Sequence, residues 1–243
     1  MWQFFHKLGS PRWFYGISSA VLPWLSLLTA AVLLTGVVWG LAFAPMDFKQ
    51  GNSFRIIYIH VPAAFIALAG YYVMAVAGAV FLVWRMKMAD IMLRAAAPIG
   101  AMMTFIALVT GAIWGKPTWG TWWVWDARIT SMLVLFFLYL GVIALAAAYQ
   151  REALGSKAAA ILSLVGTVNI PIIYKSVDWW YSLHQPASIK LTARPSIHPD
   201  MWWPLVMTII GFYLLYAILL MLYARADILQ REQRTRWVQE LIR

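Results

Sequence analysis

A cluster of tryptophans followed by an acid is the feature of the sequence with the clearest chemical potential. The segment reads Trp119-Gly120-Thr121-Trp122-Trp123-Val124-Trp125-Asp126-Ala127-Arg128-Ile129-Thr130. If it is a helix that begins near Pro117, one face carries most of its rings and its acid, namely Trp119, Trp122, Trp123, Asp126 and Thr130. Trp125 and Ile129 lie beside that face, and Arg128 points away from it. Such a face predicts a flat aromatic shelf for a large planar ligand, and the alternative is an interfacial tryptophan belt.

Three histidines are placed where they can accompany this shelf. His60 precedes Pro62, which suits the first turn of a helix and therefore puts His60 near the end of a span. His184 follows Trp180 by four positions, so the two share a face if that stretch is helical. His198 lies between two prolines in irregular sequence, and His6 has no site role. Taken singly, each histidine is explained as a polar residue of an interface or a loop.

The composition is that of a membrane protein. Hydrophobic residues make up 63% of the 243 residues, charged residues make up 12%, and the mean hydropathy is +0.73. Soluble domains have about 25% charged residues and disordered chains have few apolar ones, so both classes are excluded. The absence of cysteine excludes disulfides, thiolate metal sites and covalent haem attachment through C-x-x-C-H.

Six apolar stretches are long enough to cross a bilayer as helices, and the short alternating segments of a barrel do not occur. They run approximately over residues 17–43, 57–84, 91–114, 129–149, 158–174 and 203–223. The sequence predicts one all-α integral membrane domain over residues 1–243, with six transmembrane helices and an external amphipathic Trp-rich segment at 115–130. It also predicts a third external loop at 176–202 and a basic cytoplasmic surface helix at 225–243.

Most of the 19 basic residues fall on one side of these spans. That side carries Lys7, Arg12, Arg85, Lys87, Arg94, Arg151, Lys157, Arg225, Arg231, Arg234, Arg236 and Arg243. Because basic residues concentrate in cytoplasmic loops, both termini are expected in the cytoplasm and the tryptophan segment outside. Because this rule already places basic residues at the cytoplasmic ends of the spans, the net charge of +10 does not require nucleic acid as a partner.

The tryptophan segment resembles the WWD signature of the haem-handling proteins of cytochrome c maturation. The usual form is WGxWWxWDxRLT, and this sequence has WGTWWVWDARIT, with Ile129 where leucine is usual. Three subfamilies carry the signature. With six spans in 243 residues, the chain resembles the cytochrome c maturation protein C family, because proteins of the other two subfamilies are much larger. The resemblance extends over essentially the whole chain.

The resemblance implies a haem carrier rather than an enzyme. It implies non-covalent haem b at the periplasmic face of the bacterial inner membrane, with His60 and His184 as axial ligands and His198 in reserve. The haem shelf would comprise Trp119, Trp122, Trp123, Trp125 and Asp126. The haem propionates need cations, for which the external candidates are Arg55, Lys116, Arg128, Lys190 and Arg194.

The resemblance also implies partners. These are maturation proteins A and B, which form an ABC transporter, the small membrane protein D, and the haem chaperone, maturation protein E. The sequence has no nucleotide-binding motif and no recognisable acid–base pair or nucleophile. Two other functions stay open. A b-type cytochrome subunit needs histidines within the spans, and a permease for haem or a small solute needs intramembrane charge, for which Arg94 is the deepest candidate.

Overall fold

The computed structural model describes Lys7 and residues 9–149, 152–184 and 197–242, and within them long helices dominate. The helices are α2 (Pro11–Val38), η1 (Trp39–Phe43), η2 (Asn52–Ile56), α3 (Ile57–Trp84), α4 (Lys87–Trp119), α5 (Ala127–Ala148), α6 (Glu152–Gly166), α7 (Asn169–Trp179), α8 (Pro199–Glu232) and α9 (Arg236–Ile242). Within these described residues six segments are long and apolar enough to cross a membrane, which confirms the predicted all-α membrane fold.

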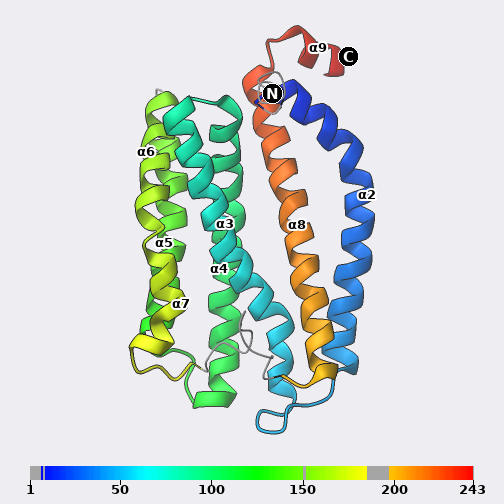
Figure 1. Cartoon of the computed structure of the whole chain (residues 1–243), viewed down its shortest axis with the longest axis vertical. Helices are drawn as coiled ribbons and strands as arrows, with labels where there is room; N and C mark the ends of the chain where they lie inside the picture. Colours follow the sequence, from blue (N-terminus) through cyan, green and yellow to red (C-terminus); the bar gives the residue numbers. More distant parts are fainter. Residues whose placement is uncertain (1–6, 8, 150–151, 185–196, 243) are drawn as a thin grey trace.

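The helices form a bundle in which α3 to α7 make one group (Figure 1). Helix α8 packs against α3 and α4, and α2 packs against the outer side of α8. The N- and C-terminal parts of the chain lie at one end of the bundle, and α4 ends at the opposite end (Figure 1). The distal end of the bundle is the end where α4 stops at Trp119 and α5 starts at Ala127.

Small residues allow the helices to approach closely. A Cβ atom at Gly36 of α2 would lie 2.9 Å from the backbone nitrogen of Thr208 on α8. A Cβ at Gly100 of α4 would overlap the ring of Tyr139, whose hydroxyl donates to the carbonyl of Ala67 at 2.8 Å. Apolar burial adds little driving force between helices in lipid, so this close packing and interhelical hydrogen bonding hold the bundle together.

Two predicted helices differ in the structure. The fifth span, predicted as one helix over 158–174, is broken between α6 and α7, where the side-chain amide of Asn169 donates to the carbonyl of Ser131 at 2.9 Å. The surface helix predicted over 225–243 is wrong in its first part. Helix α8 continues to Glu232, because Asp90 of α4 and Asp227 pair with Arg231 and support the extra turns, and only α9 is separate.

Candidate functional site

A cavity of about 470 Å³ lies at the distal end of the bundle, between α3 and α4 on one side and α5 and α7 on the other. On α3 its wall runs from Ile57 to Leu68, a distance of about 16 Å along a helix. Small side chains such as Ala64 and Gly111 leave the space, while Leu68 and Leu108 line the part farthest from the loops. The cavity is therefore a largely apolar slot with its polar groups near the distal end.

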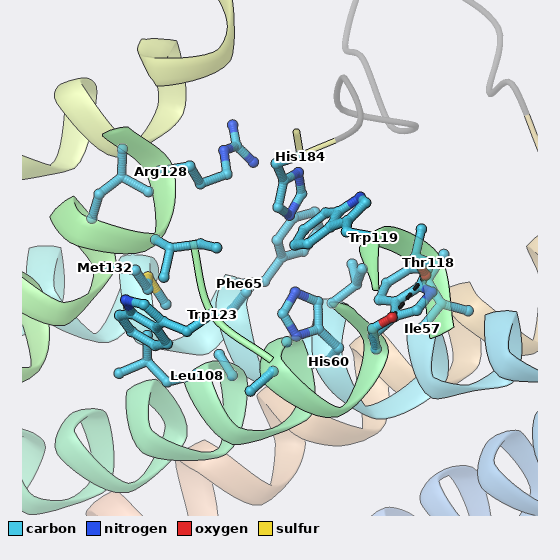
Figure 2. Close-up of a pocket in the computed structure, with 18 of the residues that line it drawn as sticks. Ile57, His60, Phe65, Leu108, Thr118, Trp119, Trp123, Arg128, Met132 and His184 are labelled. Carbon is cyan, nitrogen blue, oxygen red and sulfur yellow. Dashed lines mark hydrogen bonds between the residues drawn. The ribbon is translucent and has the colours of Figure 1, made fainter. Parts of the chain in front are cut away.

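His60 and His184 meet in this slot. Their ring centres are 6.5 Å apart, and their ring planes are inclined by 34°. Figure 2 shows the two imidazoles turned toward each other, with Trp119 beside them. The structure thus brings together the two histidines that the sequence analysis paired, although 124 positions separate them in the chain.

The ring of His60 is held by its neighbours on α4. Its Nδ1 atom lies 3.0 Å from the hydroxyl oxygen of Thr110. The ring of Trp114 packs edge-on against it at 5.7 Å, and the indole N–H of Trp114 donates to the side-chain oxygen of Gln50 at 2.6 Å. A Cβ at Gly111 would lie 3.2 Å from Cε1 of the imidazole, so the glycine admits the ring. Thr110, Trp114, Gln50 and Gly111 were not predicted from the sequence.

His60 lies in the first turn of α3, so the predicted place near the end of the span is correct. The prediction that Pro62 lies in the first turn of this helix is wrong, because α3 begins at Ile57 and Pro62 lies one turn farther in. The preceding η2 helix runs directly into α3, and the aromatic side chain of Phe54 in η2 packs edge-on against Trp114 at 5.7 Å. Helix α3 thus starts ahead of the position that the proline indicates.

His184 lies in the segment that follows α7. The helix ends at Trp179, so the helical face that was predicted to join Trp180 and His184 does not form. Instead the backbone N–H of His184 donates to the hydroxyl oxygen of Ser182 at 3.1 Å. The ring of Trp119 lies 6.2 Å from the imidazole. A local turn and an aromatic contact position this histidine.

The tryptophan segment is not one surface helix, contrary to the sequence analysis. Its first residue ends α4, Gly120 takes a left-handed conformation with φ of 79°, and α5 starts only at Ala127. A glycine at this point ends a helix without strain, and the carboxylate of Asp126 caps the next one by accepting from the backbone N–H of Ile129 at 2.8 Å. Pro117 accordingly lies in the last turn of α4, not in a first turn.

The predicted shelf residues take three different positions. Trp119, Trp122 and Trp123 line the cavity. Trp125 is 74% exposed, is not among the lining residues, and packs against Trp123 at 5.4 Å. Asp126 is buried but also does not line the cavity; one of its carboxylate oxygens accepts a hydrogen bond from the Ser182 hydroxyl. Both residues adjoin the site through their neighbours.

Arg128 faces the cavity, although the helical projection pointed it away. The projection failed because α5 starts afresh at Ala127 and sets a new helical phase. The guanidinium of Arg128 donates to the hydroxyl of Ser176 at 3.3 Å and to the carbonyl of Tyr174 at 3.2 Å. Among the described lining residues it is the sole Lys or Arg.

The other basic and histidine candidates are engaged elsewhere or are not described. The guanidinium of Arg55 donates to the carbonyl of Ala44 at 2.6 Å, and Lys116 donates to the carbonyl of Gly120 at 3.1 Å. His198 caps α8, with its imidazole accepting from the N–H of Asp200 at 3.3 Å. His6, Lys190 and Arg194 lie outside the described residues.

Comparisons with known proteins identify the family. Residues 4–239 match the family model described as heme exporter protein C. The chain is 53% identical over 242 residues to heme exporter protein C of Escherichia coli K12, an alignment that covers 100% of this chain and 98% of the relative. It is 49% identical over 241 residues to the Haemophilus influenzae protein of that name, covering 99% and 98%, and 45% identical over 228 residues to the Bradyrhizobium diazoefficiens one, covering 94% and 86%. The chain belongs to the heme exporter protein C family.

Proposed function

We propose that this protein holds haem in the distal cavity with His60 and His184 as the two axial ligands and passes it to an external acceptor for cytochrome c biogenesis. The observation that carries the proposal is the distance of 6.5 Å between the two imidazole centres. Two imidazoles on opposite sides of one iron have centres roughly 6 Å apart, since each metal–nitrogen bond is about 2 Å and each ring centre lies about 1 Å beyond its nitrogen.

The cavity walls also suit a porphyrin. The volume of about 470 Å³ is within the usual range of ligand pockets, and the walls are mostly apolar and aromatic. Leu68 and Leu108 offer an apolar surface at the deep end, whereas Arg128 stands near the distal end. This polarity supports an orientation in which the apolar edge of haem lies deep and the propionates point toward Arg128.

The protein is proposed to act as a carrier. The relatives are named heme exporter proteins, which supports a role in moving haem rather than in converting it. The chain has no nucleotide-binding motif, so the energy for release is assigned to an ABC transporter made of maturation proteins A and B, with the small protein D. Maturation protein E, the haem chaperone, is the proposed acceptor.

The proposed orientation puts both termini in the cytoplasm and the distal cavity at the periplasmic face of the inner membrane. The excess of basic residues at the other end of the bundle supports it. A reporter that is active only in the periplasm should be active when fused after Lys49 and inactive when fused after Met86. The reverse result would place the cavity in the cytoplasm and overturn the proposed delivery to an external acceptor.

Ligation is tested with the purified full-length protein and its bound haem. His60→Ala and His184→Ala should each lose the six-coordinate low-spin spectrum and retain less haem, and added imidazole should partly restore that spectrum by filling the emptied position. His198→Ala is the control and should keep the spectrum, because its side chain is 65% exposed and does not line the cavity. Loss of the spectrum in the control alone would show that the pair is wrongly assigned. An unchanged spectrum in all three variants would contradict the proposal that histidines are the axial ligands of the haem iron.

A further inference from the structure

Thr110 of α4 is a polar neighbour of His60 and lies behind the residues that line the cavity. Its hydroxyl oxygen lies 3.0 Å from Nδ1 of the imidazole, which is hydrogen-bond distance. The two residues are on different spans, so the contact forms only when α3 and α4 pack together. We infer that Thr110 is a positioning residue that fixes His60 with its proton on Nδ1 and its lone pair on Nε2. This inference rests on the proposed function for its role in haem binding.

The direction of the hydrogen bond follows from the other contacts of Thr110. A threonine hydroxyl has one proton to donate and two lone pairs that accept. Its oxygen lies 2.6 Å from the carbonyl of Ile106 and 3.3 Å from that of Ala107, one helical turn back, and carbonyls only accept. The hydroxyl proton is therefore given to the helix carbonyl. The remaining lone pairs can accept only from a proton on Nδ1 of His60.

This donor role decides which nitrogen is available to a metal. A neutral imidazole carries one proton, so protonation of Nδ1 leaves the lone pair on Nε2. Metal-bound histidines generally donate their other N–H to a fixed acceptor, which sets both the tautomer and the angle of the ring. Thr110 supplies a side-chain acceptor beside the backbone carbonyl of Ala107, and the ring is further confined by Trp114 at 5.7 Å and by the close approach of Gly111.

The same helix contains a matched control. Thr104 is also buried, and its hydroxyl donates to the carbonyl of Gly100 at 2.7 Å, four residues back. It therefore makes the same local bond as Thr110. Neither threonine lines the cavity, but among the described contacts only Thr110 pairs with a histidine. Valine has nearly the shape of threonine, so each replacement removes a helix-bonded hydroxyl, but only Thr110→Val removes a hydroxyl that accepts from His60.

The direct test reads the tautomer in haem-free, full-length protein labelled with ¹⁵N-histidine, with the His60 signals identified by their loss in His60→Ala. Wild type and Thr110→Ser should show a protonated Nδ1 and an unprotonated Nε2. Thr110→Val should move part of the proton population to Nε2, since the carbonyl of Ala107 still accepts from Nδ1, and Thr104→Val should match wild type. If Thr110→Val fails to fold, Thr110→Ala removes the hydroxyl without the second methyl group. An unchanged tautomer in the folded variant overturns the inference.

The second test measures haem binding by titration. The loss of such an orienting partner typically lowers metal affinity by about 10- to 100-fold, so Thr110→Val should weaken haem binding by about that factor. Thr110→Ser should recover most of the loss and Thr104→Val should be close to wild type. Equal losses in the two valine variants would make the role of Thr110 merely structural and overturn the inference. If His60→Ala leaves haem binding unchanged, the proposed haem site fails, while the haem-free tautomer still decides what Thr110 does to His60.

Discussion

The Ser182 hydroxyl donates a hydrogen bond to the carboxylate of Asp126, although the two residues are 56 positions apart in the chain. The same hydroxyl oxygen accepts from the backbone N–H of His184 at 3.1 Å. The other oxygen of Asp126 accepts from the N–H of Ile129 at 2.8 Å and caps α5. One carboxylate therefore joins the start of α5 to the segment that carries His184. This is a positioning role, because Asp126 itself does not line the cavity.

Asp126→Asn should loosen His184 without unfolding the protein. Asparagine caps helices about as well as aspartate, so α5 should keep its start, but the charge-assisted bond to Ser182 is lost. We expect a partial loss of the six-coordinate haem spectrum, largely restored by imidazole, in this variant and in Ser182→Ala. The control is Asp178→Asn, because the Asp178 carboxylate is 61% exposed and pairs with Lys175 on the surface. Wild-type spectra in both test variants would contradict the positioning role.

Within the tryptophan segment, Trp119 and Trp125 should behave differently. Trp119 lines the cavity beside His184, whereas Trp125 is 74% exposed and lies outside it. An aromatic contact contributes about 0.5–1.5 kcal/mol beyond simple burial, which is roughly 2- to 10-fold in affinity. Trp119→Ala should lower haem affinity by at least that factor and Trp125→Ala should leave it near wild type, as measured by haem titration. Equal losses would return Trp125 to the haem shelf that the sequence predicted.

Much of the fold could be predicted from the sequence because a helix must be apolar over about 20 residues to cross the bilayer. Apolar length fixed the number of spans and their order, and the pairing of His60 with His184 followed from the family resemblance. The predicted helix bounds are wrong at places where polar contacts, and not only the length of the apolar stretch, determine where a helix ends. At the break before Asn169 the side-chain amide of Asn169 bonds a carbonyl of α5, and the extra turns of α8 pair with Asp90 of α4. Neither partner is apparent from the local sequence, although Pro171, which has no N–H to donate to the preceding turn, itself favours a break there.

The shape of the site was harder to predict than its histidines. The helical periodicity of the tryptophans favoured one helix, although Gly120 and Asp126 are a helix-ending and a helix-starting residue and the break was readable in them. Arg128 was misplaced as a consequence. Thr110 and Gln50 could not be found, because their contacts with His60 and Trp114 form only once α3, α4 and the preceding loop are packed.

Arg128→Gln should weaken haem binding through the propionates. A hydrogen bond to a charged group is worth about 1.5–3 kcal/mol, so we expect roughly 10- to 100-fold weaker binding in a haem titration. The dimethyl ester of haem lacks the propionate charges, and its affinity should change little on this substitution. Lys116→Gln is the control, since Lys116 is exposed and donates to the carbonyl of Gly120. Equal losses for haem and its ester would assign Arg128 a structural role through Tyr174 and Ser176 instead.

At the opposite end of the bundle, Asp90 should govern stability rather than haem binding. It is 3% exposed, and its two carboxylate oxygens accept from Arg94 at 3.3 Å and from Arg231 at 2.7 Å. Arg231 also bonds Asp227 at 2.8 Å, so the network joins α4 to the end of α8. A buried carboxylate between two guanidinium groups cannot be removed without leaving their charge poorly compensated, and breaking a buried pair in this way costs about 3–5 kcal/mol.

Asp90→Asn should therefore lower the midpoint of thermal unfolding strongly, whereas the haem spectrum of the folded fraction should stay that of wild type because the distal cavity is untouched. The matched control is Glu240→Gln, which breaks the exposed pair with Arg236. Exposed pairs contribute only about 0.2–1 kcal/mol, so this variant should unfold near the wild-type temperature. A wild-type midpoint for Asp90→Asn would show that the network adds nothing to stability. An altered haem spectrum in its folded fraction would instead show that the two ends of the bundle are coupled.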